Sequence, residues 1–296
     1  MTTERLADAP KVSVVVPHYH DLAGLALCLA ALGNQTYPKD RLEVVIADNA
    51  SPEGEAAVAK VIAGRAKLVV VTEKGAGPAR NGGVAASSGE VLAFIDSDCV
   101  AEPAWIEEGV KALGGHDFVG GRVKVLVADP ARVTAVEAFE RVFAFDFKTY
   151  IERKHFTGAG NLFCPRPLFE RVGGFKTGVS EDLEWSRRAQ GFGYSLGYAP
   201  LAVVGHPARR TWAELLAKWR RINVETYGLS AGRPARRLRW FLRTLLLPAS
   251  AVVHSAKVLA SPELGSASER LGAIAVLFRI RLWRFGDSFR LLFAGG

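Results

Sequence analysis

Short apolar runs recur through the first hundred residues and alternate with polar or glycine-rich segments. Four of them, at residues 12–16, 42–47, 67–72 and 91–95, are rich in Val, Ile and Leu. Runs that lack regular polar alternation are typical of strands buried on both faces of a parallel sheet. The pattern therefore predicts four buried strands in the first third of the chain.

Signals for helix starts stand between and after these runs. Each signal consists of a capping side chain, an early proline, or a capping residue followed by proline. The four signals lie at Asp21, Ser51-Pro52, Gly77-Pro78 and Pro103. Strand–helix units in series are typical of an α/β fold with a mostly parallel sheet flanked by helices. Ligands bind such sheets at the carboxyl ends of the strands, so the residues just after each strand are the first candidates for a site.

The pattern changes after residue 117. We expect a strand over 118–127, an aromatic-rich helix or loop over 131–150, a helix over 180–190 and one or two short strands over 194–205. Two apolar helical stretches that carry Arg and Trp follow, at 240–260 and 271–293. The predicted organisation is a catalytic domain over 1–230 and a basic, amphipathic helical extension over 231–296.

Charge separates these two parts. The chain has 296 residues with 38 Lys and Arg against 30 Asp and Glu, a net charge of +8. Residues 231–296 hold 11 basic and 3 acidic residues, so the whole excess lies there. A neutral body with a basic tail predicts an anionic partner for the tail. The overall content, 49% hydrophobic and 23% charged, excludes a disordered or coiled-coil chain.

Cysteine usage and the chain start bear on the compartment. Cys28, Cys99 and Cys164 show no paired spacing, which predicts small buried side chains in a reducing environment. The first ten residues are polar, so no signal peptide is expected. No stretch reaches the roughly 18 uninterrupted apolar residues of a spanning helix.

The acidic motif Asp96-Ser97-Asp98 directly follows the apolar run at 91–95. Two carboxylates at a strand end can approach one hard divalent cation, Mg²⁺ or Mn²⁺, which commonly bridges to substrate phosphates. His206, after another probable strand, could add a nitrogen ligand. The alternative is an ordinary acidic turn with a structural histidine.

Two further motifs follow strands in the first hundred residues. Asp48 ends the second apolar run and could accept hydrogen bonds from a nucleobase or ribose. The glycine-rich run 75–83 half-matches a dinucleotide fingerprint, but Arg80 stands in place of the third glycine. An Arg in a first helical turn offers a fork for a phosphate. The alternatives are a turn-forming Asp-Asn pair and a solvated Arg.

A pair of acids, Glu181 and Asp182, opens the predicted helix at 180–190. The helix dipole stabilises ionised carboxylates at this position, so one of them could act as a general base near a bound sugar. Plain helix capping is the alternative.

Taken in order, these motifs resemble the family 2 glycosyltransferases with the GT-A fold, over roughly residues 11–210. The resemblance rests on Val-Val-Val-Pro-His-Tyr, Val-Val-Ile-Ala-Asp-Asn-Ala-Ser, Gly-Pro-Ala-Arg-Asn-Gly-Gly, Phe-Ile-Asp-Ser-Asp, Val-Gly-Gly-Phe and Glu-Asp. It implies an inverting transferase that moves a sugar from a nucleotide-diphospho-sugar, with uridine diphosphate as the first candidate carrier, to a hydroxyl acceptor. Mg²⁺ or Mn²⁺ is the implied cofactor.

The resemblance also implies a role for each candidate residue. Asp182 would be the catalytic base, Asp98 the main metal ligand and His206 a second group near the metal. The nucleotide sugar would be bound by Pro17, Tyr19, Asp48, Arg80, Asp96 and Ser97. The sugar or acceptor pocket would involve Gly160, Asn161, Glu181 and Trp185.

Several departures from the family pattern narrow the expectation. The second strand ends Ala47-Asp48 where the family usually has two aspartates. The processive motif Gln-x-x-Arg-Trp is replaced by the segment 218–221, Lys-Trp-Arg-Arg, and no series of spanning helices is present in the pattern. A non-processive enzyme is therefore expected. The alternatives are a nucleotidyltransferase or flavin- or NAD-binding oxidoreductase, and a degenerate nucleotide-sugar-binding protein without activity.

The basic extension suits a membrane surface. Arg and Trp mixed into apolar helices are typical of the headgroup boundary of anionic membranes, although helices packed on the catalytic domain would show a similar pattern. Nucleic acid is the weaker partner because no recognition fold accompanies the charge. We expect a peripheral protein on the cytoplasmic face of the membrane, with a lipid-linked or surface-polysaccharide acceptor.

Overall fold

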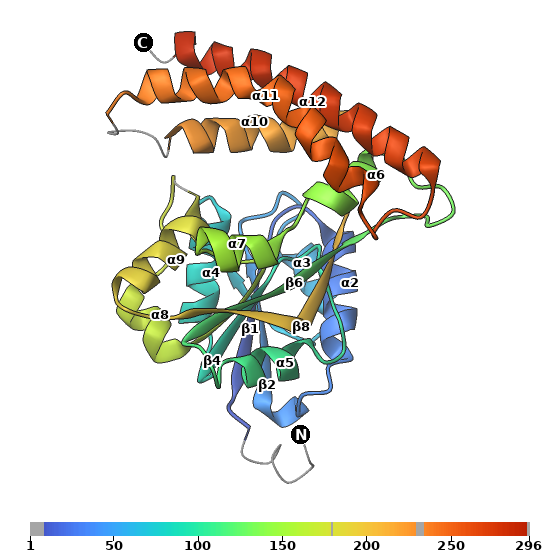
Figure 1. The fold of residues 1–296 in the computed structure, drawn as a ribbon. Helices are drawn as coiled ribbons and strands as arrows, with labels where there is room; N and C mark the ends of the chain where they lie inside the picture. Colours follow the sequence, from blue (N-terminus) through green and yellow to red (C-terminus); the bar gives the residue numbers. More distant parts are fainter. Residues whose placement is uncertain (1–8, 179, 229–233, 295–296) are drawn as a thin grey trace. The chain divides into compact units, whose positions relative to one another are not determined.

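The computed structural model describes residues 9–178, 180–228 and 234–294. The expected domain boundary at residue 230 lies outside the described residues. So do residues 1–8, most of the N-terminal segment in which no signal peptide is expected. Figure 1 shows a central sheet with helices on both of its faces, and a group of long C-terminal helices. The chain divides into two compact units, residues 1–124 with 146–206, and residues 125–145 with 207–296.

The first unit is built on an eight-stranded sheet of order β3-β2-β1-β4-β7-β6-β8-β5. The strands are β1 (Val12–His18), β2 (Leu42–Asp48), β3 (Lys67–Val70), β4 (Val91–Ile95), β5 (Val100–Ala101), β6 (Phe118–Leu126), β7 (Asn161–Pro165) and β8 (Leu196–Pro207). β1 runs parallel to β2 and β4, and β2 parallel to β3. β7 runs antiparallel to β4 and β6, and β5 antiparallel to β8. The predicted α/β class with a mostly parallel sheet and flanking helices is confirmed.

Both faces of the parallel strands are buried, as the unbroken apolar runs predict. In β4, Ala93 and Ile95 join the apolar cluster on one face, whereas Leu92 and Phe94 join the cluster on the other. Successive side chains of a strand point to opposite faces, so an alternating apolar–polar strand could not fill both clusters. The helices on these faces are α2 (Leu22–Gly33), α3 (Glu55–Ile62), α4 (Ala76–Ala85), α5 (Trp105–Ala112), α7 (Phe147–Lys154), α8 (Arg166–Val172) and α9 (Glu181–Gly191).

Two expected elements differ from those observed. The helix expected at Ser51-Pro52 begins only at Glu55, after Gly54 with a φ of +80°. Ser51 does not cap it, because its hydroxyl instead donates to Asp48. Where one or two short strands were expected over 194–205, the chain forms one long strand, β8, over Leu196–Pro207.

The second unit consists of α6 (Ala135–Phe143), α10 (Trp212–Gly228), α11 (Arg236–Leu259) and α12 (Ala267–Ala294). α6 begins with a reciprocal capping box between Thr134 and Glu137. The apolar core of the second unit contains Phe139 from α6, Leu215 from α10, Ala251 from α11 and Leu277 from α12. Residues 207–228, expected with the catalytic domain, are thus grouped with the C-terminal helices. Among the described helices, none combines the length and apolar character needed to cross a bilayer.

Candidate functional site

The parallel register brings two acidic strand ends close together. His18 at the end of β1 is paired with Asp48 at the end of β2, and β4, which also pairs with β1, leads directly into Asp96. Polar side chains therefore gather where β1, β2 and β4 end. This is the edge at which ligands bind open α/β sheets.

Asp48 is held by three hydrogen bonds and is only 1% exposed. His18 Nδ1 lies 2.8 Å from Asp48 Oδ1, the Ser51 hydroxyl donates to the same oxygen at 2.5 Å, and the Ser51 amide donates to Oδ2 at 3.1 Å. Burial opposes ionisation, but the bonds from Ser51 and His18 outweigh it and lower the pKa of Asp48. In this structure Asp48 therefore anchors the loop after β2 instead of presenting a free carboxylate to a nucleobase.

Arg80 joins the two acidic motifs. Its side chain is buried, its Nη2 donates to Asp96 Oδ1 at 2.5 Å, and its Nη1 forms an ion pair with Glu181. Burial disfavours the guanidinium charge, but Asp96 and Glu181 outweigh it and raise the pKa of Arg80. The fork expected to face a phosphate is thus occupied by two carboxylates, which Arg80 fixes in position.

The glycine-rich start of α4 permits this pairing. A Cβ atom on Gly77 would lie 2.7 Å from the Glu181 carboxylate and 3.2 Å from Phe175, so any larger residue would push Glu181 away. The run that resembles a dinucleotide fingerprint therefore serves close approach of α4 to α9. Close packing of the two helices thus explains the glycine at position 77 without pyrophosphate binding.

Asp182 stands at the start of α9 beside the loop that carries Gly158 and Gly160. Its Oδ1 accepts hydrogen bonds from the Ser180 hydroxyl at 3.1 Å and from the Leu183 amide at 2.8 Å. A Cβ on Gly158 would lie 3.6 Å from Asp182 Oδ2, and a Cβ on Gly160 would lie 2.5 Å from Asp96 Oδ2. The loop thus passes against both carboxylates, and Gly160 lies beside Asp96.

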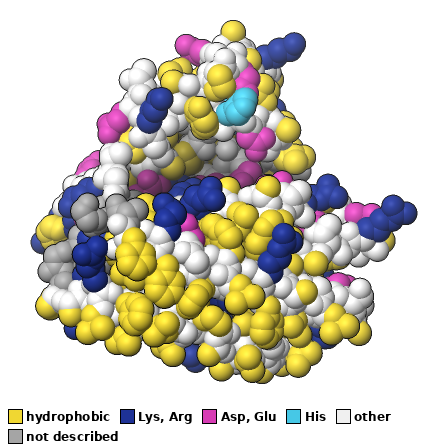
Figure 2. Space-filling view, turned by 90° about the horizontal axis from the view of Figure 1, so that it is seen from above, with side chains coloured by type: hydrophobic (Ala, Val, Ile, Leu, Met, Phe, Trp, Pro, Cys, Tyr) yellow, Lys and Arg dark blue, Asp and Glu magenta, His cyan; other side chains and the backbone are white. Residues whose placement is uncertain are grey.

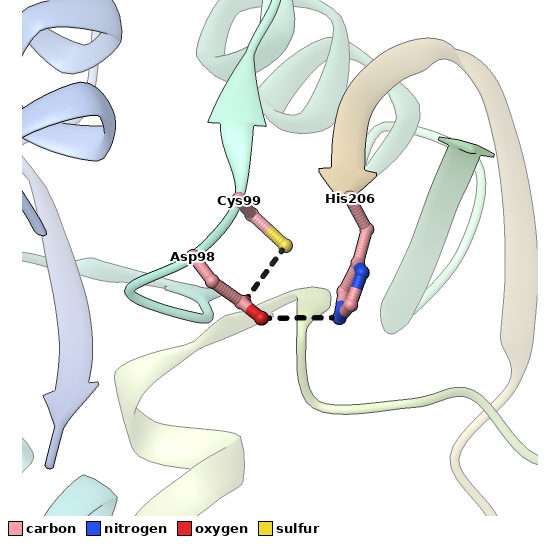
Figure 3. A group of neighbouring side chains, drawn as sticks. All are labelled: Asp98, Cys99 and His206. Atoms are coloured by element: carbon pink, nitrogen blue, oxygen red, sulfur yellow. Dashed lines mark hydrogen bonds and ion pairs between the residues drawn. The ribbon is translucent and has the colours of Figure 1, made fainter. Parts of the chain in front are cut away.

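A potential metal site lies where β5 and β8 meet. Asp98, Cys99 and His206 offer ligand atoms within 4.8 Å of one another, and His206 Nε2 lies 3.4 Å from Asp98 Oδ2 (Figure 3). The antiparallel pairing of Val100 with Gly205 brings these residues together. Asp96, whose carboxylate is bonded to Arg80, is not part of this group.

The donor chemistry of this group suits a hard divalent cation. Burial raises the pKa of Asp98; His206 opposes the shift and Asp96 adds to it, so a cation there would relieve repulsion between carboxylates. Burial, with Asp96 and Asp98, raises the pKa of the Cys99 thiol well above its ordinary value, and Mg²⁺ and Mn²⁺ prefer oxygen ligands to sulfur, so Cys99 is the poorest of the three candidate ligands for such a cation. One carboxylate and one imidazole, with substrate oxygens and water, fit Mg²⁺ or Mn²⁺.

Two residues predicted to line the sugar or acceptor pocket are buried in the core of the structure. Trp185 is 0% exposed, packs edge-on against Phe118 and donates from Nε1 to the Gly173 carbonyl. Asn161 is also 0% exposed; its Oδ1 accepts from Trp105 and its Nδ2 donates to two backbone carbonyls. The hydrogen-bonding atoms of both side chains are thus used inside the fold.

The remaining predicted residues lie at the strand ends. Tyr19 is 61% exposed after β1, whereas Pro17 within β1 and Ser97 after β4 are partly buried. Tyr19 is the most accessible of the three to a nucleotide.

Sequence reasoning missed two asparagines that hold loops at the site. Asn49 accepts from the Gly75 amide and donates to the carbonyls of Val71 and Glu73, which fixes the approach to α4. Asn81 both donates to and accepts from the backbone of Phe175. Both asparagines stand in motifs recognised in the sequence, Asp-Asn and Asn-Gly-Gly, and their position there could have indicated a role at the site.

The sheet, the Asp-Ser-Asp motif after β4 and the Asp98–His206 pair define a nucleotide-diphospho-sugar transferase of the GT-A fold. The model for glycosyl transferase family 2 matches residues 13–176, and the chain belongs to that family. It is a glycosyltransferase, which confirms the expected enzyme class and does not favour the oxidoreductase alternative.

Named relatives share this classification. Glycosyltransferase AglE of Haloferax volcanii is 35% identical over 221 residues, 72% of each chain. Probable glycosyltransferase YdaM of Bacillus subtilis is 27% identical over 225 residues, 71% of this chain and 53% of its own length.

Two solved structures show the same fold. The mannosyltransferase PcManGT from Pyrobaculum calidifontis, in complex with GDP-Man and Mn²⁺, has a TM-score of 0.56 at 23% identity and covers 97% of this chain and 86% of its own. S. aureus TarS has a TM-score of 0.51 at 14% identity, over 95% of this chain and 54% of its own.

Proposed function

We propose that this chain is an inverting, non-processive, metal-dependent enzyme that transfers one sugar from a nucleotide-diphospho-sugar to a hydroxyl acceptor. The observation that carries the proposal is the loop 158–160, which lies against Asp182 on one side and Asp96 on the other. A candidate base and the Asp-Ser-Asp motif thus border the same short segment. This is the arrangement needed to bring an acceptor hydroxyl to the sugar of a bound donor.

Asp182 is the proposed general base. Its Oδ1 is occupied by hydrogen bonds from Ser180 and Leu183, which leaves Oδ2, on the side of Gly158, to take the acceptor proton. The deprotonated oxygen attacks the anomeric carbon from the face opposite the nucleotide, so the configuration inverts without a covalent sugar–enzyme intermediate.

Asp98 and His206 are the residues that would hold Mg²⁺ or Mn²⁺. The cation, when bound, supplies charge stabilisation for the departing diphosphate. Arg80 holds the carboxylates of Asp96 and Glu181 in position through its two ion pairs. A uridine diphosphate sugar is the first donor to test, and GDP-mannose, named for the Pyrobaculum structure, is the second.

A thermal-shift screen of nucleotide sugars with and without Mn²⁺ or Mg²⁺ tests the donor and the metal together. Asp182→Asn should keep donor stabilisation and lose transfer, whereas Glu184→Gln, in the same first turn of α9 and paired with Arg188 and Lys176, should keep both. Near wild-type turnover by Asp182→Asn would remove Asp182 from the base role. Absence of any metal-dependent donor shift would refute the proposed donor class.

We also propose that the helices after residue 230 bring the enzyme to the cytoplasmic face of an anionic membrane, where a lipid-linked or surface-polysaccharide precursor is the acceptor. Large exposed apolar side chains concentrate there: Leu238, Phe241, Leu242, Leu245, Leu246, Val252, Val253, Leu259, Leu271, Phe278, Leu282 and Phe293. Figure 2 shows hydrophobic side chains gathered among Lys and Arg on one face of the molecule. Apolar helices with this basic content bind the headgroup region of anionic bilayers.

Co-sedimentation of the full chain with vesicles tests this association. Binding to phosphatidylglycerol-containing vesicles that falls with added salt is expected, with weaker binding to pure phosphatidylcholine. Equal absence of binding to both would refute it. The full chain is preferable to a truncation, because α11 and α12 supply Ala251 and Leu277 to the core of the second unit.

A further inference from the structure

Three arginines of the second unit lie on two helices that pack against each other, and two of them, Arg281 and Arg284, are three residues apart on one face of α12. They are Arg243 on α11 and Arg281 and Arg284 on α12, two helices in extensive contact. Burial lowers the pKa of Arg281 and Arg284, and the charge of Arg243 lowers both further. Arg281 also lowers the pKa of Arg284, whereas Asp287 opposes the shift. Arginine stays protonated in proteins, so the region keeps its positive charge at a cost in free energy.

Acidic side chains offset only part of this positive charge. Arg284 is buried and donates from Nε to Asn223 Oδ1 at 3.1 Å, and Asn223 in turn donates to Asp287 at 3.0 Å. Asp287 is itself paired with a fourth arginine, Arg290, at 3.0 Å. Within residues 9–178, 180–228 and 234–294, no carboxylate forms an ion pair with Arg243, Arg281 or Arg284.

Two buried N–H groups in the same region lack an acceptor. Arg281 Nε and the indole Nε1 of Trp219 on α10 are buried and have no hydrogen-bond partner among the described residues. The Arg284 guanidinium stacks 4.1 Å from the centre of the Trp219 ring, which places the indole beside the arginines. Buried donors without acceptors are rare in folded proteins, so these two point to a ligand that supplies oxygen atoms.

Apolar surface borders the arginines along both helices. Leu242 and Leu246 on α11 are 52% and 66% exposed, and Phe278 and Leu282 on α12 are 39% and 59% exposed. Each pair is spaced four residues apart and so shares one face of its helix. An anion bound here would lie next to exposed apolar side chains. The acyl chains of a lipid can pack on that surface, whereas a free inorganic ion has no apolar part to bury there.

We propose that Arg243, Arg281 and Trp219 form a binding site for the phosphate group of an anionic membrane lipid, with acyl chains on the leucines and phenylalanine of α11 and α12. The proposal deepens the membrane association proposed above and rests on it for the lipid source. A free phosphate would present the same oxygens, and the experiment separates the two. The site differs from the donor site, since all of its residues belong to the second unit.

Vesicle binding of matched variants tests the site. Arg281→Gln and Arg239→Gln each remove one charge. Arg239 is an exposed residue of α11, one turn before Arg243, and unlike Arg281 it has no buried donor without an acceptor. Diffuse attraction predicts the same loss of affinity for phosphatidylglycerol vesicles in both variants, about fivefold for one surface arginine. A phosphate site predicts that Arg281→Gln loses roughly tenfold or more while Arg239→Gln loses about fivefold. Equal losses would overturn the proposal.

Two further measurements distinguish the other outcomes. Arg281→Lys keeps the charge but removes the buried Nε donor, so an affinity between those of wild type and Arg281→Gln, with an unchanged melting temperature, supports the site even if Arg281→Gln folds poorly. Thermal stabilisation by inorganic phosphate or pyrophosphate that depends on Arg281, without a vesicle effect, would overturn the lipid source. Donor binding is measured separately on the same variants, so failure here and failure of the transferase proposal are distinguishable.

Discussion

Replacement of Arg80 by methionine is the sharpest test of how the site is held together. Methionine retains apolar bulk where the Arg80 stem lies but removes the charge that pairs with Asp96 and Glu181. Two carboxylates are then left near each other without a counter-charge. We therefore expect a loss of stability together with a loss of order at the start of α9.

The size of the effect follows from burial. The Arg80 side chain is 6% exposed, whereas those of Asp96 and Glu181 are 36% and 23% exposed. Breaking a fully buried ion pair costs about 3–5 kcal/mol, and water that reaches these carboxylates reduces the cost to about 2–3 kcal/mol. For a unit of this size that corresponds to a drop in melting temperature of roughly 5–10 °C.

Urea unfolding of wild type, Arg80→Met and Arg187→Met provides the measurement. Arg187 is an exposed arginine of α9, so its replacement should change the free energy of unfolding by less than about 0.5 kcal/mol. Adding Glu181→Gln to Arg80→Met should restore part of the loss, because one unpaired carboxylate disappears. A stability of Arg80→Met equal to that of Arg187→Met would refute the account of Arg80 as the centre of the acidic cluster.

Three other predictions concern the metal, the core and acid stability. His206→Ala should weaken Mn²⁺-dependent donor binding by about tenfold or more. Cys99→Ala should leave it unchanged, because Mn²⁺ prefers oxygen and nitrogen ligands to a thiol. Titration of Mn²⁺ in the thermal-shift assay measures both effects. Trp185→Ala should cost about 3–5 kcal/mol in urea unfolding, and a shift in KM at unchanged stability would instead return Trp185 to a pocket. Asp48 has a lowered pKa in the fold, so its contribution to stability is present at neutral pH and is lost as the pH falls below about 4. Asp48→Asn should flatten the dependence of unfolding free energy on pH between neutral and acid conditions, and an unchanged slope would contradict the assignment.

The local pattern of apolar and polar residues predicted much of the fold. The unbroken apolar runs predicted β1, β2 and β4 and their burial on both faces, because a strand covered on two sides has no solvent-facing positions to fill with polar residues. The acidic residues after β4 could be placed at the ligand-binding edge for the same reason, since the carboxyl ends of parallel strands share one edge. The helix expected at Ser51-Pro52 began at Glu55, because the Ser51 hydroxyl binds Asp48 across the turn.

What only the tertiary structure decided is which side chains meet. Arg80 and Glu181 are 101 residues apart, and no local pattern shows that their ion pair takes the fork expected for a phosphate. Trp185 and Asn161 were expected in a pocket, but the packing of α9 and β7 turns both into the core. Residues 125–145 join the C-terminal helices for the same reason: α6 has an apolar face that is buried only against partners far along the chain. Periodicity specifies whether a side chain is buried, whereas its partner depends on how distant elements pack, and this chain's site is built almost entirely from such long-range pairs.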